Sequence, residues 1–329
     1  MKLLILGGTA WLGRTVAETA LAQNHDVTCV ARGTGAPVGA RLIRADRDDE
    51  GALDAVAAER WDAVIDVGRQ PGHVRWAAAA LAETAGRYVF VSSANVYASQ
   101  AEHGADEGAA LLAPLTADAY TSPDDYGAAK VACETAVLDA FGEARSAIVR
   151  AGLIGGPGDP SGRTTYWPRR FARPSSPSGE VLIPDAPDLP TAIIDVRDLA
   201  AWLVQLADGG ASGTYNAQGD VRAFADHLAA ARAVTGHAGP LVVAAEDWLR
   251  ERDVAEWSGP RSLPLWLADR TWWGMNDRST ARARGAGLAM RPLSETLADA
   301  LAAGHAEGKA GLSDPDERVL LTELTREQP

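Results

Sequence analysis

The 329-residue sequence predicts an α/β protein, with a doubly wound parallel sheet followed by a smaller carboxy-terminal α+β domain. Two observations carry this prediction. Apolar runs of strand length alternate with alanine-rich helical segments over the first half of the chain, and the first such run leads straight into a glycine-rich turn. After about Gly155 the alternation breaks, and stretches rich in glycine, proline and serine take its place.

Strands are expected at short apolar runs, and helices where apolar residues recur at helical spacing. The expected strands span 2–6, 26–31, 41–44, 63–67, 88–92 and 147–150, and the helices between them span 12–23, 50–59, 72–85 and 126–141. Further along, strands are expected at 191–194 and 213–217, and helices at 195–206, 222–235, 245–256 and 294–303. Right-handed crossovers then make the sheet doubly wound and place ligands at the carboxyl ends of its strands.

Composition excludes several functions. The formal net charge of −13 disfavours nucleic acid and anionic membrane surfaces as partners, because no basic excess exists to neutralise phosphates. No apolar stretch approaches the length of a spanning helix, and the initial MKLLILGG is interpreted as a buried strand rather than a signal peptide. The only cysteines, Cys29 and Cys133, form no disulfide framework, which favours a reducing cytoplasm. The six histidines show no paired spacing, so no metal site is expected.

The turn after the first strand has the pattern of a dinucleotide-binding turn. Gly7 allows the tight turn, Gly13 allows close packing of helix on strand, and the helix amino terminus offers N–H groups to a pyrophosphate. The residues expected to contact the cofactor here are Gly7, Thr9, Ala10, Trp11, Leu12, Gly13 and Arg14.

The end of the second strand favours NADP(H) over NAD(H). An NAD site usually places Asp or Glu there to hold the ribose 2′-hydroxyl, whereas this chain has Ala31 followed by Arg32. Arg14 and Arg32 suit a 2′-phosphate because the guanidinium fork matches phosphate oxygens. Arg32 as a solvated loop residue is the alternative. Asp46, followed by Arg47, either accepts a hydrogen bond from the adenine amino group or caps a helix.

The most informative constellation is Ser92-Ser93 at the end of a strand and Tyr126-x-x-x-Lys130 on a helix. Tyr and Lys four residues apart share one helix face, so the ammonium is expected to approach the phenol and lower its pKa. Tyr126 then serves as general acid or base while Ser93 holds the substrate oxygen. Lysine is rare here, since only Lys2, Lys130 and Lys309 occur, which makes chance a poor explanation of the pattern.

With these motifs the sequence resembles the extended, epimerase/dehydratase-like branch of the short-chain dehydrogenase/reductase superfamily. It is most similar to bacterial GGTxxLGR oxidoreductases that are isoflavone-reductase-like or epimerase-like. The resemblance runs from about Met1 to Ala303 and includes the segments 46–48, 148–157, 194–200 and 291–297. It implies a Rossmann fold, with residues 1–165 and 191–217 forming the NADP-binding domain. Residues 166–190 and 218–310 would form the substrate domain, and residues 311–329 a polar tail, either a frayed helix or disordered.

The resemblance also implies roles for single residues. Ser93, Tyr126 and Lys130 would be catalytic, and Lys130 would also hold the nicotinamide ribose. Val67, Gly68, Leu153, Ile154 and Arg47 would contribute to the cofactor site. Three departures stand out: Ala10 replaces the middle glycine of the turn, Ala151 replaces a proline after Arg150, and Ala94-Asn95 replaces the acidic pair of sugar dehydratases, which argues against dehydration.

Substrate recognition is expected in the second half. Tyr166 and Trp167 would stack on a ring and Arg169 or Arg170 would bind an anionic group, with packing and surface roles as the equally weighted alternative. Asn95 is a further substrate candidate. The cluster of Trp266, Trp272 and Trp273 has the same ambiguity, with a core role favoured. In the family, the helix that corresponds to 126–141 forms a dimer bundle, so a homodimer is expected as one option and a monomer as the other.

The sequence therefore predicts an NADP(H)-dependent oxidoreductase acting on a carbonyl/alcohol pair of a small molecule. An NAD-dependent nucleotide-sugar epimerase is the first alternative, and a non-catalytic protein that senses the dinucleotide is the second.

Overall fold

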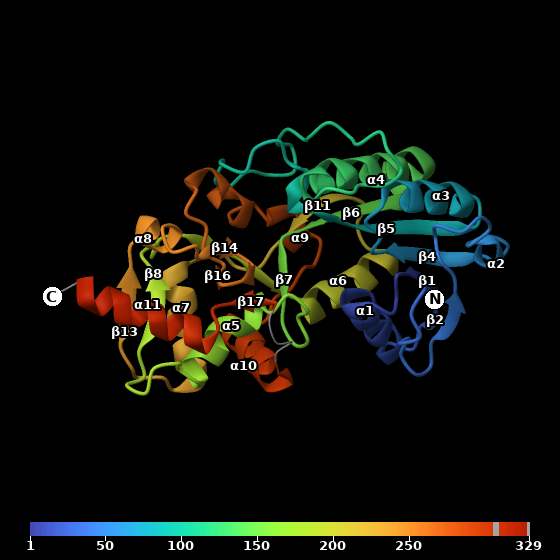
Figure 1. The fold of residues 1–329 in the computed structure, drawn as a ribbon. Coiled ribbons are helices and arrows are strands. Elements are labelled where there is room, and N and C mark those ends of the chain that lie inside the picture. The colour runs from blue at the N-terminus through green and yellow to red at the C-terminus, as the bar shows by residue number, and fades with distance from the viewer. Residues whose placement is uncertain (305–308, 328–329) are drawn as a thin grey trace. The chain divides into compact units, whose positions relative to one another are not determined.

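The computed structural model describes residues 1–304 and 309–327 and divides into two compact units (Figure 1). Unit 1 consists of Met1–Gly152, Val196–Gln218 and Arg278–Ala289. Unit 2 consists of Leu153–Asp195, Gly219–Asp277 and Met290–Pro329. No helix in the described part of the chain is long and apolar enough to span a membrane.

Unit 1 is built on a seven-stranded sheet, and all its strand pairs are parallel. In spatial order the strands are β11 (Gly213–Ala217), β6 (Ser146–Ala151), β5 (Ala85–Ser93), β4 (Trp61–Asp66), β1 (Lys2–Leu6), β2 (Asp26–Ala31) and β3 (Arg41–Arg44). The chain order reverses between β1 and β4, which opens a crevice at the carboxyl ends of these strands. The predicted doubly wound parallel sheet is confirmed.

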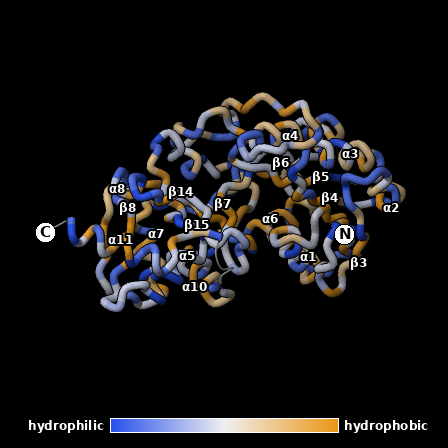
Figure 2. The backbone as a smooth tube through the Cα atoms, in the orientation of Figure 1, coloured by the Kyte–Doolittle hydropathy of each residue, from blue (hydrophilic) through white to orange (hydrophobic). Residues whose placement is uncertain are grey.

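Helices cover both faces of this sheet (Figure 1). The helix α1 (Trp11–Ala22) packs on α6 (Val196–Ala207) over one face, and α3 (Pro71–Leu81) packs on α4 (Tyr126–Phe141) over the other. The short helices of unit 1 are α2 (Asp54–Ala57) and α9 (Ala281–Gly285), with 3-10 turns η1 (Ala94–Val96), η2 (Pro123–Asp125) and η3 (Glu143–Arg145). Strand side chains such as Leu4 and Phe90 are buried because helices lie on both sides, and these strands are apolar in Figure 2.

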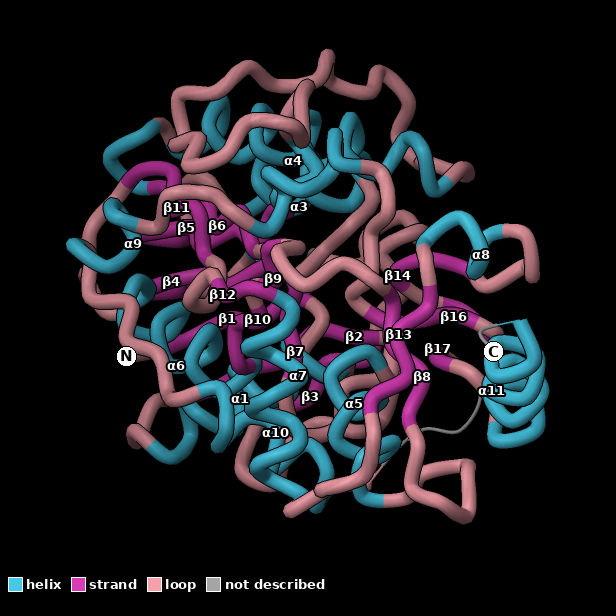
Figure 3. Tube along the Cα trace, turned by 90° about the vertical axis from the view of Figure 1, so that its left-hand side faces the viewer, coloured by secondary structure: helices cyan, strands magenta, loops and turns pink. Residues whose placement is uncertain are grey.

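The described residues of unit 2 form five two-stranded ribbons and several helices, which Figure 3 labels. The ribbons pair β7 (Leu153–Gly155) with β10 (Ile193–Asp195), β8 (Val181–Pro184) with β13 (Leu241–Ala244), β9 (Pro190–Thr191) with β12 (Arg222–Ala223), β14 (Ala255–Trp257) with β16 (Ser262–Pro264), and β15 (Gly259–Pro260) with β17 (Ala310–Gly311). The helices are α5 (Arg163–Ala172), α7 (Phe224–Thr235), α8 (Glu246–Arg250), α10 (Leu293–Ala303), α11 (Asp314–Glu327) and the 3-10 helix η4 (Arg270–Asn276).

Aromatic side chains form the centre of the unit 2 core. Trp167 packs edge-on against Phe224 and beside Phe171, and Trp266 is also fully buried. The predicted core role of the tryptophan cluster applies to Trp266, whereas Trp272 is 44% exposed. A small unit assembled from short ribbons needs large side chains to bury enough apolar area.

The chain differs from the sequence prediction in two segments, and in a third it selects between two alternatives. The helix expected at 50–59 is reduced to α2, because turns at Asp49 and Gly51 precede it. The helix expected at 245–256 ends at Arg250, because Asp253 adopts a left-handed conformation with φ 54° and the chain continues into β14. For the polar tail, where a frayed helix and disorder were the two alternatives, Asp314–Glu327 forms the helix α11, whose buried leucines Leu320, Leu321 and Leu324 join the unit 2 core.

Candidate functional site

The glycine-rich turn has the geometry that close approach of a phosphate requires. Gly7 has φ +97°, a conformation that favours glycine. A Cβ on Gly13 would lie 2.3 Å from the Gly7 carbonyl oxygen, so only glycine lets α1 pack this closely on β1. The residue before α1, Ala10, has no capping side chain, which leaves N–H groups at the helix start for a ligand. The turn therefore fits a dinucleotide pyrophosphate.

A cavity of about 750 Å³ runs along this edge of the sheet, between the loops that follow β1, β2, β3 and β4. The predicted cofactor residues that line it are Gly7, Thr9, Ala10, Arg32, Asp46, Arg47, Val67 and Gly68. Trp11, Leu12, Gly13 and Arg14 lie on α1 behind the turn. Arg14 does not line the cavity, since its side chain donates to Glu18 and to the Gly35 carbonyl. Leu153 and Ile154 belong to β7 in unit 2.

The rim of the cavity carries one exposed cation at the end of β2. Arg32 is 74% exposed and lies 3.7 Å from the Asp46 carboxylate. Asp46 also accepts a hydrogen bond from the backbone N–H of Asp48 at 3.2 Å, so it organises the turn after β3 while still lining the cavity. No carboxylate follows β2 at the position that NAD sites use, because Ala31 and Arg32 stand there.

A buried ion pair supports the middle of the cavity. The Arg47 guanidinium lies 3.0 Å from the fully buried Asp66 carboxylate at the end of β4, and the Tyr88 hydroxyl donates to Asp66 at 2.7 Å. Burial and the Asp66 charge raise the pKa of Tyr88 well above its ordinary value. Arg47 is held against Gly68, where any side chain would collide with its guanidinium. The prediction for Arg47 did not include this partner, because Asp66 lies in what reads as an ordinary buried strand.

Tyr126 and Ser93 meet where α4 begins beside the end of β5. The start of α4 packs tightly on η1, since a Cβ on Gly127 would lie 2.2 Å from the Asn95 carbonyl oxygen. Ser93 Oγ accepts a hydrogen bond from the Asn95 N–H at 3.2 Å and donates one to Asn95 Oδ1 at 3.4 Å, and the same hydroxyl acts on the pKa of Tyr126. Asn95, the further substrate candidate, is partly buried in η1 beside this pair.

Burial raises the pKa of Tyr126, while the Ser93 hydroxyl and the charge of Arg69 act in the opposite direction. The lowering of this pKa by Lys130 that the sequence predicts is therefore not found. The reason is where the ammonium points: Lys130 Nζ donates to the carbonyls of Gly68 and Val91, at 2.7 Å each.

Lys130 is nevertheless an unusual lysine. It is 2% exposed and lies over the Phe90 ring, and burial lowers its pKa to about 8. Its bond to Gly68 ties α4 to the loop that lines the cavity. That loop also carries Arg69, a cation near both Tyr126 and Lys130 that sequence reasoning missed. The only signal for it was its place just after an apolar strand.

The aromatic residues expected to stack on substrate are part of the unit 2 core. Trp167 is fully buried and donates its indole N–H to the Pro264 carbonyl at 2.8 Å, and Tyr166 is 3% exposed. The predicted stacking role of both residues is corrected accordingly, because neither ring has an open face. Arg170 is also structural, with ion pairs to Asp314 and Glu317, whereas Arg169 is exposed. No group of three or more metal-ligating side chains occurs among the described residues.

Comparison with known proteins supports the family expected from the motifs. Residues 3–86 match the model of the NAD dependent epimerase/dehydratase family. No curated protein matches the chain. This match supports the expected resemblance over the part of unit 1 that holds the glycine turn and β1–β4.

Several solved structures share the fold. A candidate epimerase from Burkholderia cenocepacia is 24% identical with a TM-score of 0.66, covering 92% of this chain and 97% of its own. UDP-glucose 4-epimerase from Thermotoga maritima, solved with UDP-glucose, is 15% identical with a TM-score of 0.63 and coverages of 92% and 98%. UDP-glucose 4-epimerase from Bifidobacterium longum, solved with NAD+ and UDP, is 18% identical with a TM-score of 0.61 and coverages of 92% and 97%.

Proposed function

We propose that this protein, whose residues 3–86 match the NAD dependent epimerase/dehydratase family, is an NADP(H)-dependent oxidoreductase acting on a carbonyl/alcohol pair of a small molecule. The observation that carries the proposal is Ser93 and Tyr126 close together, with the buried Lys130 bonded to the loop of a cavity that fits a dinucleotide. When bound, the nicotinamide would supply or accept the hydride.

The proton is the part of the reaction that this chain would handle. The Ser93 hydroxyl donates a hydrogen bond to the substrate oxygen and holds it beside the Tyr126 phenol. Tyr126 gives its proton to that oxygen during reduction and removes it during oxidation. Its raised pKa keeps the phenol protonated at neutral pH, which suits the reductive direction. Lys130, with its two carbonyl partners, would orient the nicotinamide ribose and hold the Gly68 loop.

The decisive variant is Tyr126→Phe. It removes the acidic proton and keeps the ring, so we expect turnover to fall by a factor of about 10² to 10⁴, with unchanged binding of the dinucleotide. Turnover is followed at the absorbance band of reduced nicotinamide against a panel of carbonyl compounds, and binding by calorimetry. Tyr120→Phe is the matched control, because the centre of the Tyr120 ring lies 5.8 Å from the centre of the Tyr126 ring. Wild-type turnover in Tyr126→Phe would refute the proposed mechanism.

We propose NADP(H) as the preferred cofactor, with NAD(H) as the alternative. The support is the exposed Arg32 guanidinium at the rim and the missing carboxylate after β2. Arg14 no longer contributes, because its side chain is occupied by Glu18 and Gly35. Arg32→Ala should weaken NADPH binding about tenfold or more and leave NADH binding nearly unchanged. Tighter binding of NADH by the unaltered protein would contradict the preference.

The second candidate function is epimerisation of a nucleotide sugar. Similar solved structures include UDP-sugar epimerases, one of them with NAD+ and UDP, which favours this alternative. An epimerase retains its cofactor through the cycle, so it predicts NAD(H) that copurifies with the protein and no net consumption of added cofactor. Mass spectrometry of the heat-released nucleotide, combined with the absorbance assay above, separates the two functions.

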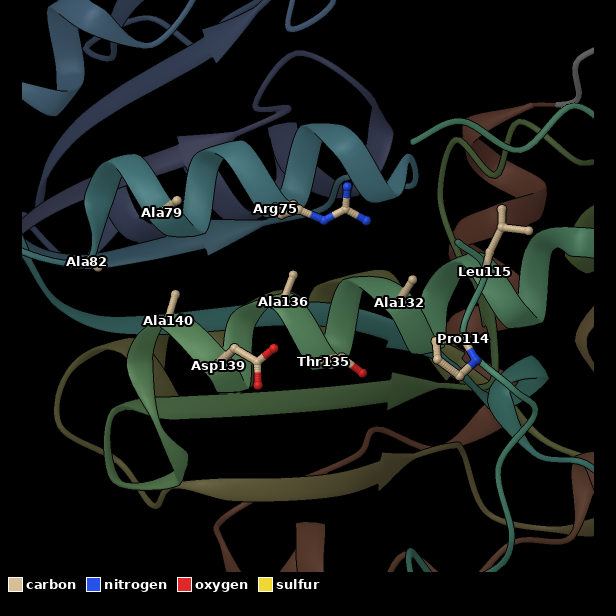
Figure 4. A pocket seen from close by; sticks show the side chains of 10 residues that line it. All are labelled: Arg75, Ala79, Ala82, Pro114, Leu115, Ala132, Thr135, Ala136, Asp139 and Ala140. Atoms are coloured by element: carbon tan, nitrogen blue, oxygen red, sulfur yellow. The ribbon is translucent and has the colours of Figure 1, made fainter. Parts of the chain in front are cut away.

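We further propose a homodimer formed through the outer faces of α3 and α4. A groove of about 460 Å³ lies between these helices (Figure 4). Most of the side chains that line the groove are small, among them Ala79, Ala132 and Ala136, and small side chains permit close approach of another helix pair. Arg75 on α3, which forms an ion pair with Asp118 of its own chain, and Asp139 on α4 line it with opposite charges, so two-fold symmetry could bring Asp139 of a second copy to Arg75 as a further partner. Ala136→Arg should convert a dimer into a monomer in light scattering, and a monomeric unaltered protein would refute this assembly.

A further inference from the structure

Arg163 differs from Arg170, Arg252 and Arg261 of unit 2 in how its charge is balanced. Arg170 pairs with Asp314 and Glu317, Arg252 with Glu323 and Glu327, and Arg261 with Asp316. Within residues 1–304 and 309–327, by contrast, the Arg163 side chain makes one hydrogen bond, from Nε to the Ser161 hydroxyl at 3.1 Å, and no ion pair. In a chain with 44 acidic and 31 basic residues, carboxylates are abundant, so this cation stands out.

The carboxylate closest in sequence is committed elsewhere. Asp159 Oδ1 accepts from the Ser161 N–H at 2.8 Å and from its hydroxyl at 2.7 Å, and Oδ2 accepts from the Thr164 N–H at 3.1 Å and from its hydroxyl at 2.9 Å. Asp159 is 5% exposed and shapes the loop that leads into α5. Its negative charge acts on Arg163 from a distance, while both of its oxygens are saturated.

An aromatic ring fixes one face of the guanidinium. The Arg163 guanidinium carbon lies 5.1 Å from the centre of the Trp257 ring. Trp257 itself has φ +64°, a left-handed conformation that costs a bulky residue of order 1 kcal/mol or more and that recurs at ligand clamps. The backbone is held there by the Trp257 N–H bond to the Trp266 carbonyl at 2.9 Å and by the pairing of β14 with β16.

The arrangement has an energetic cost without a ligand. Burial lowers the pKa of Arg163, which shows that its surroundings disfavour the charge. A partly buried guanidinium is favoured when an anion accepts its hydrogen bonds. Here Nη1 and Nη2 have no partner among the described residues, while Ser161 and Trp257 hold the group in one orientation. The free edge of this fork matches the two oxygens of a carboxylate or phosphate.

We propose that Arg163 and Trp257 form a binding site in unit 2 for the oxyanion group of a small organic molecule. The two Nη atoms bind the oxygens of a carboxylate or phosphate, and Trp257 packs against the adjoining part of the ligand. The site goes beyond the proposed reaction, because it requires neither Tyr126 nor a dinucleotide.

The test measures binding of simple probes to the full-length protein by calorimetry and by quenching of tryptophan fluorescence. Phenyl phosphate and benzoate supply the two oxyanion types on one ring, and phenol supplies the ring without charge. We expect the unaltered protein to bind at least one anionic probe and to bind phenol at least tenfold more weakly. Arg163→Gln should weaken binding of the anionic probe at least tenfold. Arg173→Gln, which removes an exposed arginine at the end of the same helix, should leave this binding unchanged. The proposal would be overturned if Arg163→Gln bound the anionic probe as tightly as the unaltered protein does, or if the unaltered protein bound neither anion.

Two further measurements separate this site from a structural role and from the proposed function. Replacing a structural arginine would lower the melting temperature, whereas replacing a partly buried arginine without an ion pair should leave the melting temperature of the probe-free protein unchanged or raise it. A lower melting temperature in both Arg163→Gln and Arg163→Met would therefore contradict the proposal. Tyr126→Phe should bind the probes as the unaltered protein does, so loss of turnover in that variant and loss of anion binding are independent results.

Discussion

The ion pair beneath the candidate site allows a prediction with a definite magnitude. Arg150 on β6 donates Nε and Nη2 to both carboxylate oxygens of Glu134 on α4, at 2.8 to 3.3 Å. Both side chains are about 5% exposed. Ser92, the neighbour of Ser93, donates its hydroxyl to the same carboxylate. The ion pair therefore connects the helix that carries Tyr126 and Lys130 to β6, and the Ser92 hydroxyl connects the same helix to the strand end that carries Ser93.

Replacing Glu134 with Leu leaves the Arg150 cation desolvated. Only the Tyr97 hydroxyl and the Glu107 carbonyl, each at 3.1 Å, would still accept from its Nη1. Breaking a buried pair in this way costs about 3–5 kcal/mol, which is a large part of an ordinary domain's stability. The double variant Glu134→Leu/Arg150→Met removes both charges and should recover to within about 2 kcal/mol of the unaltered protein, because the desolvation cost disappears with them.

The assay is urea unfolding of the two single variants and the double variant, with turnover measured on the folded fraction. We expect a coupling energy of about 2–3 kcal/mol between the two positions, from a double-mutant cycle. The result that refutes the reasoning is a Glu134→Leu variant destabilised by less than about 1 kcal/mol, or a double variant whose loss equals the sum of the single losses.

Two other variants test the core of unit 2 and the glycine turn. Burial lowers the pKa of His227 to about 4, below its ordinary 6.5, so its unfolded form binds the proton more tightly and stability is lost as pH falls from about 6.5 to 4. Between pH 7 and 5, protonation of His227 should lower the free energy of unfolding by about 2 kcal/mol. The stability of His227→Leu should therefore depend less on acid than that of the unaltered protein or of His103→Gln, an exposed control. Equal dependence of stability on pH in all three proteins, measured by calorimetry, would contradict this prediction. Gly13→Ala should weaken dinucleotide binding at least tenfold, because the new methyl group would lie 2.3 Å from the Gly7 carbonyl oxygen and must push α1 away from the turn. Binding isotherms that match those of the unaltered protein would contradict this prediction.

Much of the unit 1 fold follows from periodicity along the chain. The apolar run at Lys2–Leu6 is long enough for a strand and buried on both faces, and its glycine turn identifies the crossover to α1. Segments whose structure depends on distant partners were not predictable in this way. The helix α11 reads as polar because most of its residues are exposed, and only three leucines and Glu317 meet the core. Glu317 is buried there by Arg170, Ser175 and the Leu182 N–H, which come from far along the chain.

The candidate site shows the same division. The positions of Ser93 and Tyr126 beside each other could be anticipated from a strand end and a helix start, since both lie at the carboxyl edge of a parallel sheet. The direction of the Lys130 ammonium could not, because the carbonyls of Gly68 and Val91 that receive it belong to two different strand ends. Trp167 gives the reverse case: its sequence context suggests a binding residue, but packing with Phe224 encloses it.

By itself, the sequence determined the parallel α/β architecture, the glycine turn at the start of α1, and the tyrosine and lysine of α4, because each depends on local spacing within one strand or helix. Tertiary structure alone decided which charges meet. It paired Arg47 with Asp66 and raised the pKa of Tyr126 by burial. It also buried Trp167 in the core and left Arg163 without an ion-paired carboxylate among the described residues. The physical reason is that burial and ion pairing depend on the distance between atoms that the chain brings together only when it folds.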